Sequence, residues 1–282
     1  MSYNLQLEHS DVVDFLSLII LMQNHSDEIS KSEYTDEVSI NDLESNSFNL
    51  DLKQDIVNNL SEKSPNGSII DYIFDRKNKL KIAFSISHLS TRVSVIFYSS
   101  EDEFEWYSNT PVTLTQLHDD VYVNTHFHEQ LSNDTLYLIQ KKLLEIYSNY
   151  SNYDIYFTGY SLGGAIATLA SYIIARELKS IDITTVSFGS PRIGNDKWAQ
   201  SFDKTQKLKK YRITTNKDVL TALPIIGYNH VGTNIILEND TFSVFDVNNV
   251  YPWYQYTLLN CWNFDKRDLK SYMNNLTKNK WY

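Results

Sequence analysis

The spacing of apolar residues changes along the chain and predicts different elements in each part. The apolar run Val12–Met22 predicts a buried helix that docks on the core, with a membrane anchor as the alternative. Residues 24–47 are polar and acidic and show no apolar period, which is typical of a solvated loop. A short helix is predicted over Leu52–Leu60, followed by a turn at residues 64–67. The start of the chain is therefore predicted to be helical and acidic.

Strand-like runs begin after this start. Leu80–Ile86 and Arg92–Tyr98 are separated by a short polar connection and predict a hairpin. A loop is predicted through Pro111–Asp120, and the pattern changes again at Asn133 or Asp134, either of which suits a helix N-cap. The apolar residues that follow at helical spacing are Leu136, Ile139, Leu143 and Ile146.

The second half of the chain alternates between strand and helix patterns. Short runs rich in branched and aromatic residues predict strands at Asp154–Thr158, Ile183–Phe188 and Lys210–Thr215. Helices are predicted at Ala165–Leu178, Trp198–Phe202 and Asp268–Leu276. This alternation predicts an α/β fold with a mainly parallel sheet and helices on both faces. At 282 residues a single domain is expected, with residues 1–62 as a helical and acidic extension packing on a core formed by residues 63–282.

Glycine is concentrated around one serine. The chain has only eight glycines, and seven of them lie between Gly159 and Gly232. Gly159 and Gly163 flank Ser161 in a Gly-x-Ser-x-Gly run between a predicted strand and a predicted helix. That arrangement holds a serine at a sharp turn as a nucleophile, and the close backbone approach requires residues without a β-carbon. A tight turn without any reaction is the alternative for Ser161.

A serine nucleophile needs an imidazole to take its proton and a carboxylate to orient the imidazole. Asp218 follows the strand that ends near Thr215, at the carboxyl edge of the sheet, and His230 is the only histidine after Ser161. The order serine, acid, histidine is that of α/β-hydrolases. Alternatively, Asp218 caps a short turn and His230 is a structural histidine bonded to loop backbone.

Four blocks of the chain resemble the class 3 (fungal-type) lipase family, in the family's order. They are Gly159–Gly164, Phe188–Asn195, Asn216–Asp218 with Leu223-Pro224, and Gly227–Gly232. A weaker match at Val95–Ser100 extends the resemblance over residues 80 to 238. The resemblance implies an α/β-hydrolase fold that cleaves carboxylic esters of acylglycerols or phospholipid-like molecules without a cofactor, with Ser161 and Asp218 in the catalytic triad. His230 is the expected third member because it is the only histidine after Ser161.

The resemblance also implies an oxyanion hole formed by Ser100 and the backbone N–H of Leu162, although Ser100 could also be a solvated loop serine. The family's arginine and glycine are replaced by Tyr98 and Ser99. Many relatives carry the catalytic histidine near the C-terminus, where this chain has Arg267 and Asp268. Either His230 is the base or the triad is incomplete. The rival interpretation is therefore a catalytically impaired, lipase-like scaffold that binds lipid or another partner.

Composition limits the partners. A formal net charge of −10 argues against nucleic acid or an anionic membrane surface as an electrostatic partner. The expected substrate is a lipid or small ester met by apolar contact, with at most peripheral membrane contact, and no obligate protein partner can be read from the sequence. Because Val12–Met22 is short and lacks signal-peptide flanks, a cytoplasmic location is favoured.

Two further segments have open interpretations. His126 and His128 would share one face of a strand and superficially suggest a metal, but they fall where the lipase family has a non-metal block, and no metal is predicted. The aromatic and acidic run Phe104–Tyr107, within residues 101–118, is either a lid that meets lipid or a packing segment.

Overall fold

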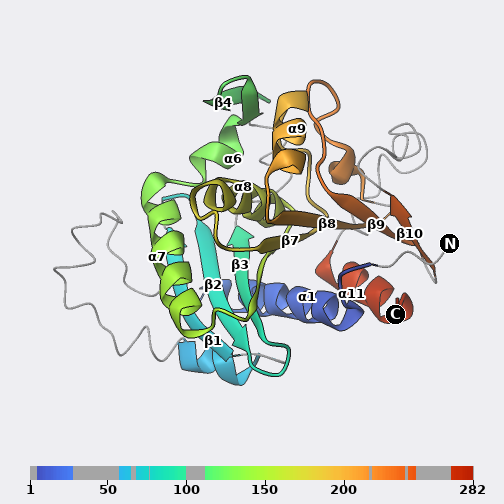
Figure 1. The fold of residues 1–282 in the computed structure, drawn as a ribbon. Helices are drawn as coiled ribbons and strands as arrows, with labels where there is room; N and C mark the ends of the chain where they lie inside the picture. The colour runs from blue at the N-terminus through green and yellow to red at the C-terminus, as the bar shows by residue number, and fades with distance from the viewer. Residues whose placement is uncertain are drawn as a thin grey trace.

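An eight-stranded sheet forms the centre of the computed structural model (Figure 1). The structure describes residues 5–27, 57–64, 68–75, 77–99, 112–215, 218–238, 241–245 and 268–281. The strand order is β1-β2-β3-β6-β7-β8-β9-β10. These strands are β1 (Ser68–Asp75), β2 (Leu80–Ser87), β3 (Arg92–Ser99), β6 (Asp154–Tyr160), β7 (Ile183–Phe188), β8 (Leu208–Thr215), β9 (Thr233–Glu238) and β10 (Thr241–Phe245).

The sheet is parallel in its middle and antiparallel at both edges. Strands β3, β6, β7, β8 and β9 pair in parallel, whereas β1, β2 and β3 form a meander and β10 pairs antiparallel with β9. The predicted hairpin is confirmed as β2 and β3. The mainly parallel sheet is also confirmed, because the strands that alternate with helices are the parallel ones.

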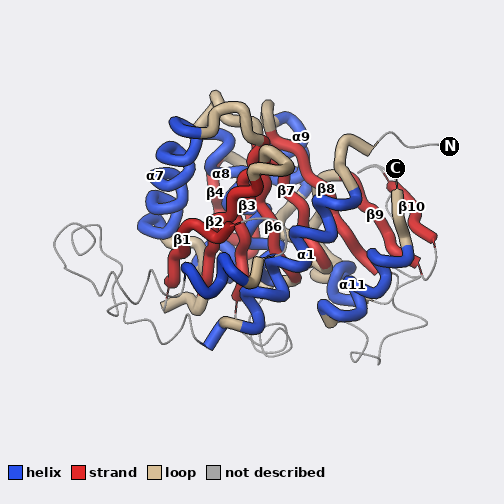
Figure 2. The backbone as a smooth tube through the Cα atoms, turned by 90° about the horizontal axis from the view of Figure 1, so that it is seen from below, coloured by secondary structure: helices blue, strands red, loops and turns tan. Residues whose placement is uncertain are grey.

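Helices cover both faces of this sheet. One face carries α7 (Asn133–Asn149), α8 (Leu162–Glu177) and α9 (Asp196–Lys204), and the other carries α1 (His9–Asn24) and α11 (Leu269–Lys278) (Figures 1 and 2). Each face has its own cluster of buried apolar side chains. Helix α7 is capped by Ser132, one residue before Asn133 and two before Asp134, the two predicted N-caps. The Ser132 hydroxyl accepts the Thr135 N–H at 3.1 Å.

Helix α1 confirms the prediction of a buried helix docked on the core. Its Asp14 accepts a hydrogen bond from Arg92 of β3 at 3.0 Å, and Asp11 forms a second ion pair with the same guanidinium. The two ends of the described chain also meet, since the Trp281 indole donates to the Leu7 carbonyl at 2.9 Å. No helix among the described residues is long and apolar enough to cross a membrane.

The predicted loop over Pro111–Asp120 is wrong in its second half. Leu114–His118 forms strand β4, which pairs antiparallel with β5 (Val121–Asn124) in a separate two-stranded sheet. The strand depends on its partner β5 rather than on its own apolar pattern, which alternates only weakly. Predictions that fall wholly or partly outside the described residues include the acidic loop after residue 27, residues 52–56 of the short helix and the Phe104–Tyr107 segment.

Candidate active site

Ser161 lies at the strand-to-helix turn that the sequence predicts. Strand β6 ends at Tyr160 and helix α8 begins at Leu162, so Ser161 is the N-cap residue, with φ 51° and ψ −119°. Positive φ is uncommon for a residue with a β-carbon and marks backbone strain. The turn is fixed by the Ser161 N–H, which donates to the Phe188 carbonyl at 2.8 Å. This is the backbone geometry of a nucleophile elbow.

The glycines around Ser161 allow strand and helix to approach closely. A β-carbon on Gly159 would lie 2.5 Å from the carbonyl carbon and oxygen of Gly163. A β-carbon on Gly163 would lie 2.5 Å from the Phe97 carbonyl oxygen of the neighbouring strand β3. Both positions meet backbone that has no room to shift, so the elbow requires glycine there.

Asp218 occupies the end of the next-but-one strand, at the same edge of the sheet. It follows β8, is fully buried, and precedes the short 3₁₀ helix η1 (Val219–Ala222). Its backbone occupies the N-cap position, but its side chain makes no capping hydrogen bond. The carboxylate Oδ2 instead accepts a hydrogen bond from the Tyr272 hydroxyl of α11 at 2.7 Å. Asp218 is therefore the N-cap residue of this turn by its backbone position, while its side chain bonds Tyr272 instead of capping.

Gly189 brings the acid and the serine together. It follows Phe188 of β7, whose carbonyl binds the Ser161 N–H, and its own φ is +58°. A β-carbon on Gly189 would lie 2.7 Å from Asp218 Oδ2 and 2.9 Å from the Tyr272 hydroxyl oxygen. The carboxylate of Asp218 thus lies against Gly189. Gly189 directly follows Phe188, whose carbonyl accepts the Ser161 N–H.

His230 bonds the protein backbone rather than Ser161 or Asp218. Its Nε2 lies 2.5 Å from the carbonyl oxygen of Thr221, in the 3₁₀ helix that follows Asp218. Within the described part of the chain, no hydrogen bond joins this imidazole to Ser161 or to Asp218. The structure therefore brings Ser161 and Asp218 to one place and holds His230 on the turn beside them. The role of His230 as the base stays a prediction.

The electrostatic surroundings of His230 are cationic. Burial lowers the pKa of His230 well below its ordinary value, and the positive charges of Arg212, Arg192 and Lys210 lower it further, against the hydrogen bond to Thr221. The imidazole is therefore neutral near pH 7. A neutral imidazole can accept a proton, which is the state that a general base needs.

Of the two residues predicted to form the oxyanion hole, Leu162 lies in the described part of the chain and Ser100 lies outside it. Leu162 is the first residue of α8, where backbone N–H groups are free of intrahelical partners and favour negative charge. Ser100 lies outside the described residues, as do Arg267 and the segment Phe104–Tyr107. The roles of Leu162 and Ser100 stay predictions.

His126 and His128 lie on the short helix α6 (Thr125–Glu129) rather than on a strand. Asn124 caps this helix by accepting the N–H groups of His126 and Phe127. Because residues two apart point in different directions on a helix, the two imidazoles do not share a face as they would on a strand. Among the described residues, no group of three histidine, cysteine or acidic side chains could hold a metal.

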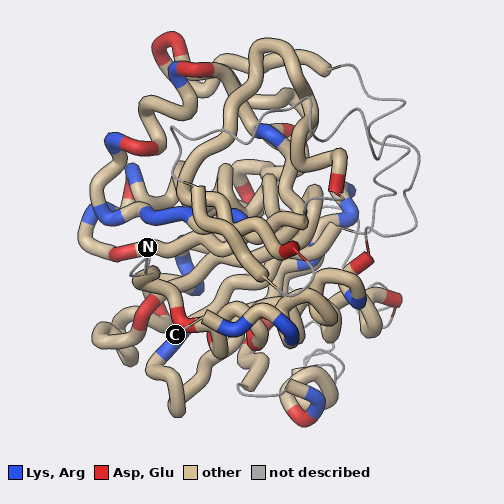
Figure 3. The backbone as a smooth tube through the Cα atoms, turned by 90° about the vertical axis from the view of Figure 1, so that its right-hand side faces the viewer, with Lys and Arg blue, Asp and Glu red and all other residues tan. Residues whose placement is uncertain are grey.

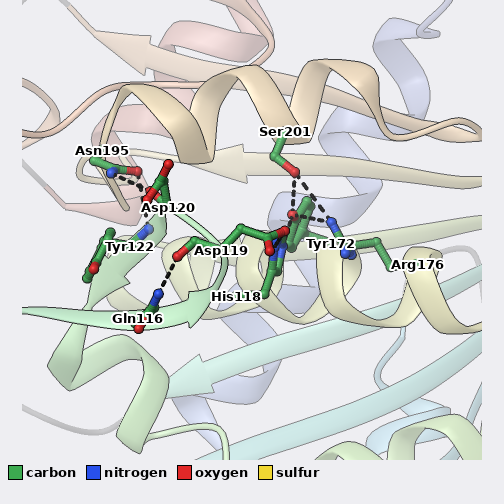
Figure 4. Close-up of polar contacts among 9 residues, drawn as sticks. All are labelled: Gln116, His118, Asp119, Asp120, Tyr122, Tyr172, Arg176, Asn195 and Ser201. Atoms are coloured by element: carbon green, nitrogen blue, oxygen red, sulfur yellow. Dashed lines mark hydrogen bonds and ion pairs between the residues drawn. The ribbon is translucent and has the colours of Figure 1, made fainter.

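The hairpin of β4 and β5 is fastened to the helices that cover the sheet (Figure 4). His118 Nε2 lies 2.7 Å from the Tyr172 hydroxyl of α8, which also accepts a hydrogen bond from Arg176 at 2.9 Å. In the turn that directly follows His118, the Asn195 side chain donates to the Asp120 carbonyl at 2.9 Å. The hairpin therefore has a defined position beside the loops that carry the candidate site.

The comparison with known families agrees with this geometry. Residues 94–228 match the family described as lipase, class 3. The resemblance to the class 3 lipases is confirmed. A phospholipase A1-II 1 from Oryza sativa subsp. indica is 35% identical over 100 residues, which cover 35% of this chain and 25% of that protein. A secreted mono- and diacylglycerol lipase LIP2 from Malassezia restricta is 37% identical over 93 residues, which cover 32% of this chain and 30% of that one.

One solved structure shares the fold over nearly the whole chain, and the predicted α/β-hydrolase fold is confirmed. The crystal structure of a mutant of MDLA from Penicillium cyclopium superposes with a TM-score of 0.68 at 18% identity, covering 95% of this chain and 99% of that one. By sequence, however, the chain spans only about a quarter to a third of the length of the curated relatives named above. The fold is therefore that of the solved lipase-like structure, and the match to the class 3 lipase family covers residues 94–228.

The residue that sequence reasoning missed is Tyr272. It lies on the predicted C-terminal helix, where a fully buried tyrosine at helical spacing reads as core. Its ring also packs edge-on against Tyr160 at a centroid distance of 5.7 Å. The sequence carries no signal for its bond to Asp218, because the two residues are 54 positions apart.

Proposed function

We propose that this chain is a serine hydrolase of carboxylic esters that acts on lipids, an acylglycerol lipase or esterase. The observation that carries the proposal is the backbone of Ser161, which keeps a positive φ between a strand and a helix at a turn only glycines can flank. Strain of this kind persists where the surroundings enforce it, and a nucleophile elbow uses such a turn to present its serine hydroxyl to a substrate. Ser161 itself is 3% exposed in this structure, so the substrate would meet it in a buried position. The class 3 lipase match supports an ester as the substrate class.

In the proposed reaction, Ser161 Oγ attacks the ester carbonyl carbon while the base takes the hydroxyl proton. The tetrahedral intermediate carries its negative charge on the former carbonyl oxygen, facing the Leu162 N–H and Ser100. When the intermediate collapses, the C–O bond to the alcohol breaks and the base returns the proton to the departing alkoxide. Water then cleaves the acyl-serine ester by the same steps and restores Ser161.

His230 is the base in this proposal, and Asp218 orients it. The ring must release the Thr221 carbonyl before its Nε2 can take the serine proton, because one nitrogen cannot serve both partners. The turn that holds His230 begins directly after Asp218, so the movement is short along the chain. Since the pKa of His230 is lowered, the ascending limb of the pH–rate curve is expected below the ordinary imidazole range.

A second function is favoured by the hydrogen bonds of the acid. The Asp218 carboxylate holds the Tyr272 phenol, and the charged groups that act on His230 are cations. A chain that kept these partners throughout would retain the fold without the proton transfer. It would act as a lipase-like scaffold that binds lipid or another partner.

Hydrolysis of p-nitrophenyl butyrate separates the two functions. The hydrolase proposal expects turnover by the wild type, and a loss on the order of 10³ to 10⁶ in kcat for Ser161→Ala and for His230→Ala. Ser201→Ala is the matched control, because its hydroxyl bonds Tyr172 in the separate network on α9. A wild type without turnover above the Ser161→Ala background would favour the scaffold.

A further inference from the structure

Two lysines are buried in the part of the chain that the structure describes. Charged residues of both signs are interspersed along the backbone in the view of Figure 3, and lysine is almost never fully buried unless it is paired. Lys81 of β2 is 1% exposed and Lys210 of β8 is 5% exposed. Lys210 donates to the Thr168 hydroxyl of α8 at 2.6 Å. Lys81 lies on the opposite face of the sheet, the face that carries α1, and its contacts lead to the elbow.

Three electron-rich groups surround the Lys81 ammonium. Its Nζ donates to the hydroxyl of Ser26, two residues beyond the end of α1, at 2.9 Å. The same atom lies 5.1 Å from the ring centroid of Phe74 on β1 and 5.7 Å from that of Tyr98 on β3. The register of the sheet places the three residues in one row, because Lys81 is paired with both Phe74 and Tyr98. Since a ring face attracts a cation, these surroundings fit the charged ammonium better than the neutral amine.

The charge of Lys81 is costly in this position. No carboxylate of the described residues forms an ion pair with it, and the Asp27 carboxylate acts from beyond ion-pair distance. Burial lowers the pKa of Lys81 to about 8, against the charge of Asp27, which raises it. The ammonium is therefore still the main form at pH 7. An unbranched apolar side chain would fill this place without losing the hydration of a charge, so a lysine that is kept here indicates a role beyond stability.

Tyr98 links the ammonium to the elbow. Strand β3 lies between β2 and β6, and Phe97 of β3 is paired with Gly159 of β6. A β-carbon on Gly163 would lie 2.5 Å from the Phe97 carbonyl oxygen and 3.5 Å from the Cα atom of Tyr98. The end of β3 is therefore the surface against which the first turn of α8 packs. The backbone of Tyr98 faces this turn, while its ring lies on the α1 face beside Lys81.

We propose that Lys81 is a positioning residue for the elbow: its ammonium fixes the ring of Tyr98 and thereby the spacing between the end of β3 and the first turn of α8. The inference rests on the proposed function, because that turn carries the Leu162 N–H predicted to bind the oxyanion. A displacement of about 1 Å in such a site can lower the rate about 100-fold. Lys81 acts through Tyr98 and not on the substrate, so its charge is used for geometry.

The positioning should depend on pH, because the attraction to the rings depends on the charge. From β1 and β3 the ammonium faces the rings of Phe74 and Tyr98, of which Tyr98 can titrate. From the end of α1 it faces the hydroxyl of Ser26, with the Asp27 carboxylate farther away. As the pH rises through about 8, Lys81 loses its proton and its attraction to both rings. Turnover should therefore decrease above pH 8 through this residue.

Turnover of p-nitrophenyl butyrate tests the proposal. Lys81→Met should lower kcat about tenfold or more and change KM less than about twofold, because a displaced elbow affects the transition state more than substrate binding. Lys81→Arg keeps the charge and should retain most of kcat. The matched control Lys142→Met removes an ion pair with Asp71 of β1 at 3.0 Å and should change kcat less than about twofold. Equal kcat values for Lys81→Met and the wild type would overturn the proposal.

The pH profile separates the charge of Lys81 from its shape and needs no variant that loses function. The kcat of the wild type should decrease with a midpoint near pH 8, and this decrease should be absent from Lys81→Arg, whose guanidinium stays charged. A double-mutant cycle of Lys81→Met with Tyr98→Leu tests the route, because two changes that break the same contact lower kcat by less than the product of their separate effects. Identical pH profiles, or independent effects in the cycle, would overturn the proposal.

Amide hydrogen exchange lets the positioning role and the hydrolase proposal fail separately. Lys81→Met should speed the exchange of peptides that contain Tyr98 or Gly163, whereas Lys142→Met should leave both unchanged. If the wild type hydrolyses no ester but Lys81→Met shows this faster exchange, Lys81 positions the elbow and the hydrolase proposal fails. If the wild type hydrolyses the ester and Lys81→Met exchanges like the wild type, the hydrolase proposal stands and the positioning role is overturned.

Discussion

The elbow around Ser161 and the loop from Asp218 to His230 lie at the same edge of one sheet, yet they are specified in different ways. The sequence signal of the elbow is local, since Gly159, Ser161 and Gly163 lie within five positions, and the turn is fixed by backbone alone, including the carbonyls of Phe97 and Phe188 on the neighbouring strands. The acid loop is specified from a distance, since the carboxylate of Asp218 is held by Tyr272 from the C-terminal helix.

The elbow and the loop from Asp218 to His230 therefore differ in how well they tolerate a substitution. Backbone that touches backbone has no alternative arrangement, so the elbow is rigid and intolerant of added atoms. A side chain that holds another side chain can exchange partners at the cost of one hydrogen bond, roughly 1 kcal/mol in net terms. A substitution in the elbow should therefore cost most of the stability of the fold, whereas a substitution in the loop from Asp218 to His230 should lower the free energy of unfolding by a smaller amount.

The largest expected effect is on the elbow. Gly159→Ala places a β-carbon 2.5 Å from the backbone of Gly163, and the variant should lose on the order of 4 kcal/mol of stability or fail to fold. Gly227→Ala is the control, because its φ is +77° but its β-carbon would meet open space. That variant should lose only about 1 kcal/mol. Urea unfolding measures both, and similar losses would contradict the account of the elbow.

A smaller effect is expected for the partner of the acid. Tyr272→Phe removes the hydroxyl that donates to the buried Asp218 carboxylate and should cost about 1–3 kcal/mol. Tyr137→Phe, at a residue 41% exposed on α7, should change the free energy of unfolding by less than about 0.5 kcal/mol. If the two variants were equally stable, the bond between Tyr272 and Asp218 would contribute nothing to the fold.

The smallest effect is a pH dependence at His230. Its pKa is lowered in the folded state, so the unfolded chain takes up the proton first as the pH falls through about 6.5. The stability contributed by the neutral imidazole is therefore complete above that pH and is lost on acidification, by at most about 1.4 kcal/mol per pH unit.

His230→Gln keeps an amide N–H that can reach the Thr221 carbonyl but cannot titrate. Urea midpoints from pH 7.5 to 5.5 should therefore fall more steeply for the wild type than for this variant. Parallel curves would mean that His230 titrates alike in the folded and unfolded chains.

Sequence reasoning succeeds where structure is set by neighbours along the chain. The parallel strands β3, β6, β7 and β8, the elbow and α11 follow from periodicity and glycine spacing, whereas the parallel strand β9 is not predicted, and the family resemblance follows from short blocks. Strand β4 and the hydrogen bond from Tyr272 to Asp218 could not be predicted in this way. Strand β4 depends on its pairing with β5, and Asp218 depends on a tyrosine from the C-terminal helix. The hydrogen bond from His230 to Thr221 spans only nine residues, yet its choice of acceptor depends on the three-dimensional path of η1.

Labelling with a fluorophosphonate probe, followed by peptide mass mapping of the adduct, tests most directly whether the strained elbow makes Ser161 a nucleophile. The account predicts one covalent adduct on Ser161 in the wild type, formed faster than on any other serine and absent from Ser161→Ala. A wild-type protein that is folded but carries no adduct, or carries it on another residue, would contradict the account.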